Sequence, residues 1–285
     1  MKNPFLFWAI MCLVYITAYS FLIDITPEEH RYIDKAQAFL GANFQTQLMS
    51  GSFGYYALFS SISTVFNSDI AIRILRFLFL LVFFGGALLV LEKANRLNYL
   101  LILMLFPSFI GLIFSQSKNI FAFGLFIYFL VKKDKPNWEF WFILSIIGSL
   151  AIATFAGIQI TFILLFYLVM KEKLFENNWK YPNLIMLGFF VILNIAYWGF
   201  LGFNQFEPVV HEEVGLLTTV LMLAVICIFD HTLIGSLSLV MGIVLFLAGQ
   251  PYWAYRPLEL MAINAVLNGR VEIGLKSLAS LIPHG

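Results

Sequence analysis

The feature that most constrains this chain is a succession of nine apolar runs, separated by short polar connections. A helix needs about 20 apolar residues to cross a bilayer, and most of these runs approach that length while two are short. The runs cover residues 5–23, 70–91, 97–114, 120–131, 138–155, 158–170, 183–203, 214–229 and 231–248. The sequence therefore predicts an all-α polytopic integral membrane protein with about nine transmembrane helices, in a range of eight to ten.

Charge content agrees with this interpretation. Only 12% of the 285 residues are charged and 61% are apolar, whereas roughly 25% of a soluble domain is charged. This composition excludes a soluble enzyme and a disordered regulator. The net charge of +1 provides no field to recruit nucleic acid, so membrane lipids are expected partners and nucleic acid is not.

The distribution of basic residues predicts which side of the membrane each connection faces. With the amino terminus in the cytoplasm, the inner end and inner connections carry nine of the 17 basic residues: Lys2, Lys93, Arg96, Lys132, Lys133, Lys135, Lys171, Lys173 and Lys180. The short outer connections carry only Lys118. Because short cytoplasmic loops are enriched in Lys and Arg, the stretch 24–69 is expected outside a bacterial inner or plasma membrane.

The outer stretch 24–69 has a helical organisation of its own. Thr26, Pro27 and Glu29 form a helix-start pattern of N-cap, first-turn Pro and capping acid. Apolar residues then recur on one helical face at Tyr32, Ile33, Ala36, Phe39 and Leu40. A second short helix is predicted over 54–66. Both are expected to lie in the membrane interface rather than to span it.

The two adjacent acids of this stretch have two interpretations. Glu28 or Glu29, at the membrane surface, could take a proton from an acceptor hydroxyl as its oxygen attacks a sugar carbon. Alternatively, both acids only stabilise the helix start, where the helix dipole favours negative charge. A denser acidic group follows at Glu207 and 211–213. We expect a solvated loop there, and binding of a divalent metal ion is the alternative.

The stretch 28–36, which reads Glu-Glu-His-Arg-Tyr-Ile-Asp-Lys-Ala, resembles the acidic motif of GT-C glycosyltransferases. These polytopic enzymes use polyprenyl-phosphate sugars, as protein O-mannosyltransferases and lipid A aminoarabinose transferases do. The resemblance continues through Gly54-Tyr55-Tyr56 and through 66–73, which ends in Arg73, and it covers about 1–170. It implies a GT-C-like core module over 1–170. The sequence itself indicates a single domain 1–285, with further transmembrane helices over 171–249 and an interfacial tail over 250–285. That tail is expected either along the membrane surface or as a short tenth helix.

The resemblance also implies roles for individual residues. Glu28 would be the base that activates the acceptor, and Glu29 an orienting or substrate-contacting acid. Tyr32 and Tyr55, within the resembling stretches, would contact substrate. Three arginines would be candidates to hold a lipid phosphate: Arg31, Arg73 and Arg256. Lys118 is a hypothetical further cation, which would approach the phosphate from the opposite wall.

The expected function is transfer of a sugar from a polyprenyl-phosphate-linked donor to a glycan, lipid or protein acceptor on the outer face. No cofactor is indicated with certainty, and a divalent metal stays possible. Other classes remain open: an exopolysaccharide or O-antigen polymerase-like protein, a lipid-linked glycan transporter, and a catalytically silent accessory subunit. The last is favoured by departures from the family pattern. Glu28 stands where the family usually has Asp, and residues 50–52 are Ser-Gly-Ser where a Lys is expected.

Overall fold

The computed structural model is all-helical over the residues that it describes, which are 4–25, 27–41, 52–105, 117–170, 173–176, 178–204, 210–250 and 254–268. The chain divides into two compact units. The first unit contains 1–104 and 109–164, and the second contains 105–108 and 165–285. The division falls inside helix α10 (Thr154–Val169), and the single domain expected from the sequence stays a prediction.

Among the described residues, three helices are long and apolar enough to cross a membrane: α1 (Pro4–Leu22), α5 (Ser68–Lys93) and the segment Lys180–Trp198 of α11 (Lys180–Asn204). Four shorter apolar helices cover Trp138–Ile152, Thr154–Val169, Leu217–Cys227 and Leu233–Leu247. The all-helical class and the presence of membrane-length helices agree with the sequence. The expected number of about nine spans is not confirmed, because most of the apolar runs form helices shorter than the bilayer thickness requires.

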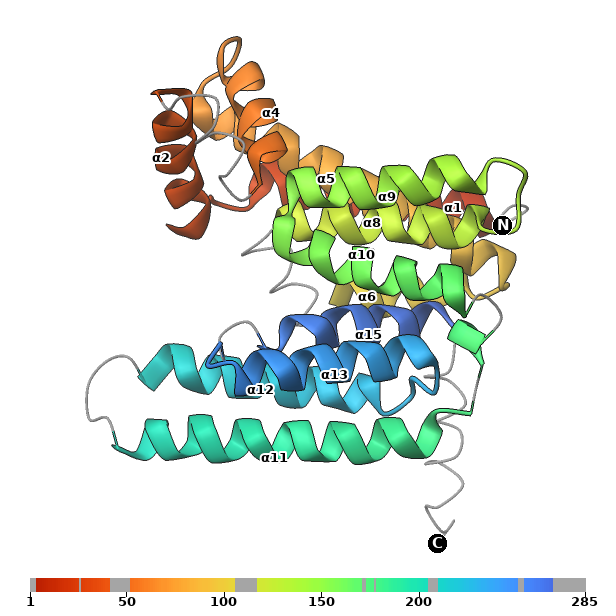
Figure 1. The fold of residues 1–285 in the computed structure, drawn as a ribbon. Helices are drawn as coiled ribbons and strands as arrows, with labels where there is room; N and C mark the ends of the chain where they lie inside the picture. Colours follow the sequence, from red (N-terminus) through yellow and green to blue (C-terminus); the bar gives the residue numbers. More distant parts are fainter. Residues whose placement is uncertain are drawn as a thin grey trace, which may run out of the picture. The chain divides into compact units, whose positions relative to one another are not determined.

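In the first unit, α5 packs against α1 and against α8 (Ser117–Lys132), and α8 packs against α9 (Trp138–Ile152) (Figure 1). Small residues allow this close approach, as is common between helices in membranes. A Cβ added at Gly124 of α8 would lie 3.0 Å from the Phe83 backbone of α5. The Ser145 hydroxyl of α9 also donates a hydrogen bond to the Leu125 carbonyl of α8, at 2.9 Å.

The run predicted at 97–114 is helical over its described part. The 3-10 turn η1 (Leu97–Tyr99) leads into α6 (Leu100–Leu105). Residues 106–116 of the run lie outside the described residues.

Between α1 and α5, the described part of the chain contains two short helices, as the sequence predicted. They are α2 (Pro27–Gly41) and α4 (Phe53–Ser63), the second having been expected at 54–66. On α2 the apolar stripe faces inward, with Tyr32 4% and Ala36 1% exposed. Thr26, the expected N-cap, lies outside the described residues. The Asn67 side chain caps α5 by accepting from the Ile70 amide at 2.8 Å.

A tight corner joins α9 to α10 at Ala153, whose φ of −141° and ψ of 80° end the helix. Gly157, one turn into α10, lies directly against the last turns of α9. A Cβ at this position would approach the Leu150 nitrogen to 2.5 Å, well inside van der Waals contact. The corner therefore requires a glycine there, because the backbones of the two helices leave no room for a side chain.

The second unit contains α11, α12 (Val210–Cys227), α13 (Leu233–Leu247) and α15 (Arg256–Leu267), together with the 3-10 turn η2 (Lys173–Phe175) (Figure 1). α15 packs against α12 and α13, and all of its 12 residues are buried. Residues 256–267 therefore form a buried helix of the second unit, and the two alternatives for the tail, along the membrane surface or as a tenth helix, stay predictions. Residues 269–285 of the tail lie outside the described residues.

A buried polar network centred on Asp230 ties the helices of the second unit together. One carboxylate oxygen of Asp230 accepts from the Thr232 amide at 2.9 Å and from the Thr232 hydroxyl at 2.6 Å. The other accepts from the Asn264 side chain of α15 at 2.7 Å. Asn183 of α11 donates to the backbone carbonyls of Asp230 and Thr232. Asp230 is 1% exposed and joins separate helices.

We expect Asp230→Ala to lower the free energy of unfolding of the second unit by about 2–4 kcal/mol, because buried hydrogen bonds to a charged group contribute ~1.5–3 kcal/mol and their partners would lose them. Thermal unfolding in detergent measures this change. Asp134→Ala removes an exposed aspartate and serves as the matched control. Equal melting temperatures for the two variants would contradict a structural role for Asp230.

Candidate functional site

A buried ion pair joins α2 to α5. Arg76 Nε donates to Glu29 Oε1 at 3.1 Å, and Arg76 Nη2 donates to Glu29 Oε2. Both side chains are essentially inaccessible, at 0% and 1% exposure. This two-point geometry is the strong form of an Arg–carboxylate contact. It anchors the predicted acidic helix to the membrane-length helix α5.

The same guanidinium also reaches the end of α1. Arg76 Nη1 donates to the carbonyls of Tyr19 and Ile23, at 3.4 and 3.1 Å, and Nη2 donates to the Asp24 carbonyl at 3.4 Å. The last carbonyls of a helix lack partners within the helix and carry its negative dipole end. Arg76 therefore satisfies the end of α1 and the carboxylate of α2 with one buried charge.

Arg73 lies one turn before Arg76 on α5 and binds the same end of α1. Its Nη1 donates to the carbonyls of Phe21 at 2.6 Å, Ile23 at 3.0 Å and Ser20 at 3.5 Å. In contrast to Arg76, Arg73 is only half-buried. The two arginines together hold the C-terminal end of α1 against the beginning of α5.

Aromatic rings fill the space between α2 and α4. The Tyr32 and Tyr55 rings meet edge to face at 5.5 Å, and Tyr55 meets Tyr56 at 5.6 Å. Tyr55 is 1% exposed, and its hydroxyl has no hydrogen-bond partner among the described residues. Burial raises the pKa of Tyr55, and the negative charge of Glu29 raises it further. The Tyr55 hydroxyl therefore stays protonated and is available as a donor.

A cation from α8 completes this cluster. Lys118 Nζ lies 4.6 Å from the Tyr32 ring centroid and donates to the Ser52 hydroxyl at 3.2 Å. Lys35 Nζ lies 6.0 Å from the same ring. Ser52 is positioned in turn by its amide, which donates to the Thr154 hydroxyl at 2.8 Å. Residues from α2, α4, α8 and α10 thus meet around Tyr32.

The structure brings together five of the residues singled out from the sequence. We call this region the polar end of the first unit, and its predicted members are Glu29, Tyr32, Tyr55, Arg73 and Lys118. Glu28 and Arg31 lie on α2 at the same end, but their side chains lie outside the described part of the structure.

Arg256 belongs to the second unit. Its Nη1 donates to Glu259 Oε1 at 3.1 Å, and its guanidinium carbon lies 4.8 Å from the Tyr255 ring centroid. Both Arg256 and Glu259 are buried, at 5% and 2% exposure. Arg256 is thus balanced by a carboxylate within its own helix.

The described residues contain no group of three His, Cys, Asp or Glu side chains that could hold a metal ion. The acidic group considered from the sequence is not covered by that finding. Glu207 and the side chains of 211–213 lie outside the described residues.

Sequence reasoning missed Arg76 and Ser52. Arg76 falls within an apolar run, and a charged residue inside such a run is expected to face a partner or a cavity. That signal was available in the sequence, although the partner on α2 was not. Ser52 lies where the GT-C pattern places a lysine, and in the structure its hydroxyl accepts from Lys118 of a different helix.

We expect Arg76→Gln to lower the free energy of unfolding by about 3–5 kcal/mol, because Glu29 would remain buried without its counter-charge. The double variant Glu29→Gln with Arg76→Gln should lose less than the sum of the two single variants, since the pair is coupled. Thermal unfolding of the four proteins in detergent gives the coupling energy. Lys93→Gln, which alters an exposed cation on the same helix, is the control; additive losses would refute the coupling.

Comparison with known proteins adds no further information on this site. No protein-family model, no curated protein and no solved structure matches this chain. A function is therefore inferred from the residues of the chain itself.

Proposed function

We propose that this protein is a membrane glycosyltransferase that moves a sugar from a polyprenyl-phosphate-linked donor to an acceptor on the outer face of a bacterial inner membrane. The observation that carries the proposal is the composition of the polar end. An acidic helix, a half-buried arginine and a partly buried lysine meet there, at the end of two membrane-length helices. The amino terminus is cytoplasmic in this proposal, which puts the polar end outside.

The acids of α2 have separate tasks in this mechanism. Both carboxylate oxygens of Glu29 accept hydrogen bonds from Arg76, so Glu29 serves to dock and orient α2. Glu28, the preceding residue on the same helix, is the base. It takes the proton of the acceptor hydroxyl as that oxygen forms a bond to the anomeric carbon of the sugar.

The cations of the polar end act on the leaving group. As the new bond forms, the bond between the anomeric carbon and the phosphate oxygen breaks, and the phosphate leaves with the electron pair. Positive charge positioned at the departing oxygen stabilises the transition state. Arg73 and Lys118 are the candidates for this charge, and attack opposite the phosphate inverts the anomeric configuration.

In this proposal Tyr32 and Tyr55 mark the side of α2 and α4 on which the sugar binds. Tyr55 carries a protonated hydroxyl, and Tyr32 and Tyr56 lie within the same cluster. All three side chains are buried, at 6% exposure or less, so the sugar meets the edge of this cluster and not the ring faces.

A catalytically silent accessory subunit is the second candidate, and the commitment of Glu29 to Arg76 favours it. In such a protein the ion pair would only hold α2 in place, and no carboxylate would need to exchange a proton. The two candidates differ in what they require of Glu28.

We expect Glu28→Gln to lower glycan transfer by about 100-fold or more, since positioned general-base catalysis contributes 10²–10⁴-fold. The measurement follows labelled sugar into membrane glycan in cells that lack the native gene and carry each variant. Asp34→Asn, at an exposed position of the same helix, should transfer normally. Unchanged transfer with Glu28→Gln would reject the catalytic assignment in favour of the silent subunit.

Lys118→Gln is expected to weaken transfer by about tenfold, because one cation at the phosphate would be lost while the proton acceptor remains. Lys118→Arg should retain most of the activity, since it keeps the charge. The same labelled-sugar measurement in membranes, over a range of donor concentrations, distinguishes weaker donor binding from slower transfer. If Lys118→Gln matched the parent at every donor concentration, Lys118 would have no part in donor use.

A further inference from the structure

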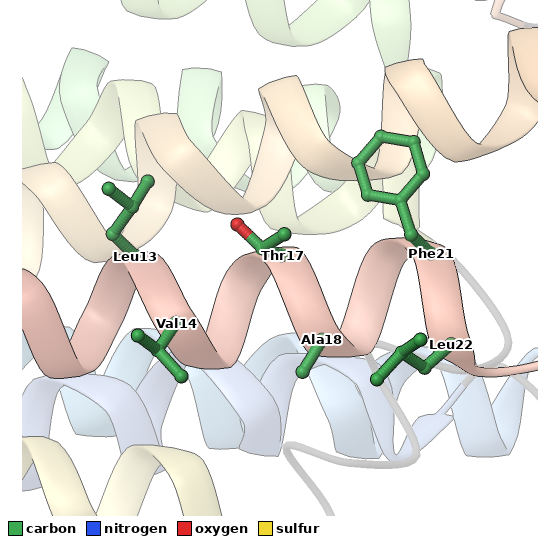
Figure 2. A pocket seen from close by; sticks show the side chains of 6 residues that line it. All are labelled: Leu13, Val14, Thr17, Ala18, Phe21 and Leu22. Atoms are coloured by element: carbon green, nitrogen blue, oxygen red, sulfur yellow. The ribbon is translucent and has the colours of Figure 1, made fainter.

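The surface of α1 has an apolar hollow of ≈ 420 Å³, a volume within the range of small-molecule sites. The described residues that line it all belong to α1 (Figure 2): Leu13, Val14, Thr17, Ala18, Phe21 and Leu22. These positions recur on one face of the helix. The hollow has a simple steric cause, because the small side chains Thr17 and Ala18 lie between larger ones on both sides.

A cation lies at one end of this hollow. Phe21, which lines it, offers its backbone carbonyl to Arg73 Nη1 at 2.6 Å. The hydrogen bonds of Arg73 to α1 all leave from Nη1, so the opposite edge of the guanidinium, with Nη2 and Nε, is not used in them. That planar edge has the shape that binds a phosphate with two parallel hydrogen bonds.

We propose that the hollow and Arg73 together bind the donor lipid, with the isoprenoid chain along the α1 face and the phosphate on Arg73. This inference rests on the proposed function and adds the place where the donor binds. It also assigns separate tasks to the cations, since Arg73 anchors the lipid phosphate and Lys118 stabilises the departing oxygen.

Charge complementarity and shape select this occupant. α1 is long and apolar enough to cross a membrane, so its exposed apolar face contacts the acyl-chain layer. An apolar face that ends in a cation fits an amphiphile with an anionic head. The described lining is one helix face wide, which suits a single isoprenoid chain better than a two-chain phospholipid. A soluble phosphate compound would leave the apolar part empty.

The site is tested with purified protein in phosphatidylcholine vesicles and a photoactivatable polyprenyl phosphate. Labelling of α1 should be competed by unlabelled polyprenyl phosphate and not by phosphatidylglycerol. Ala18→Phe, which fills the hollow, should reduce labelling about tenfold, the loss that ~1.4 kcal/mol of binding free energy represents. Ile10→Phe, at an exposed position of α1 outside the hollow, should label as the parent does.

The contribution of Arg73 is tested in the same vesicles with a photoactivatable polyprenol, which lacks the phosphate. The parent should label more strongly with the phosphate than with the alcohol, Arg73→Gln should label equally with both, and Arg73→Lys should keep part of the preference. A melting temperature for each variant identifies any variant that fails to fold. If a variant does not fold, the parent's preference for the phosphate probe over the alcohol probe tests the role of Arg73. Equal labelling of the parent by both probes would overturn the assignment to Arg73.

Two outcomes separate this inference from the proposed function. Competition by phosphatidylglycerol equal to that by polyprenyl phosphate, or full labelling of Ala18→Phe, would overturn the lipid site and show an ordinary lipid-facing surface. Specific labelling together with normal glycan transfer by Glu28→Gln would keep the lipid site and reject the catalytic assignment.

Discussion

The arrangement of the first unit depends on one buried charge. Arg76 carries a guanidinium into the interior at 0% exposure, and a charge in such surroundings persists only with full compensation. Three sources provide it: the carboxylate of Glu29, the carbonyls at the end of α1, and the ring of Tyr19 at 5.5 Å from the guanidinium carbon. The compensating groups come from α1 and α2, whereas the charge belongs to α5. The buried charge therefore fixes the positions of these three helices relative to one another. The tyrosines and Lys118 are then placed by packing onto α2.

Local patterns in the sequence predicted much of this region. The period of apolar residues on α2 placed Tyr32 and Ala36 inward, and both are buried. The short helix α4 was expected within a few residues of its observed bounds. The motifs in 24–73 also pointed to residues that lie at the polar end. These successes share a cause, since each relies on residues close together in the chain.

What the sequence did not predict was contact between distant residues. Arg76 and Glu29 are separated by 47 positions, and Lys118 reaches Ser52 across 66. In the second unit one partner of Asp230 lies 34 positions further on, at Asn264. A charged residue in an apolar run indicates that a partner exists, but its identity follows only from the packing of the helices. The number of spans stays a prediction for a related reason, because apolar length alone does not determine where a helix ends inside a packed bundle.

The network around Asp230 also bears on how the second unit is completed during synthesis. Chains fold from the amino-terminal side as they emerge, so α11, α12 and α13 are made before α15. Until Asn264 leaves the ribosome, one oxygen of the Asp230 carboxylate lacks the donor that α15 provides, and the inward faces of α12 and α13 lack their cover. A nascent chain halted before residue 264 would therefore hold a buried acid among apolar helices with one hydrogen-bond donor fewer than in the finished protein.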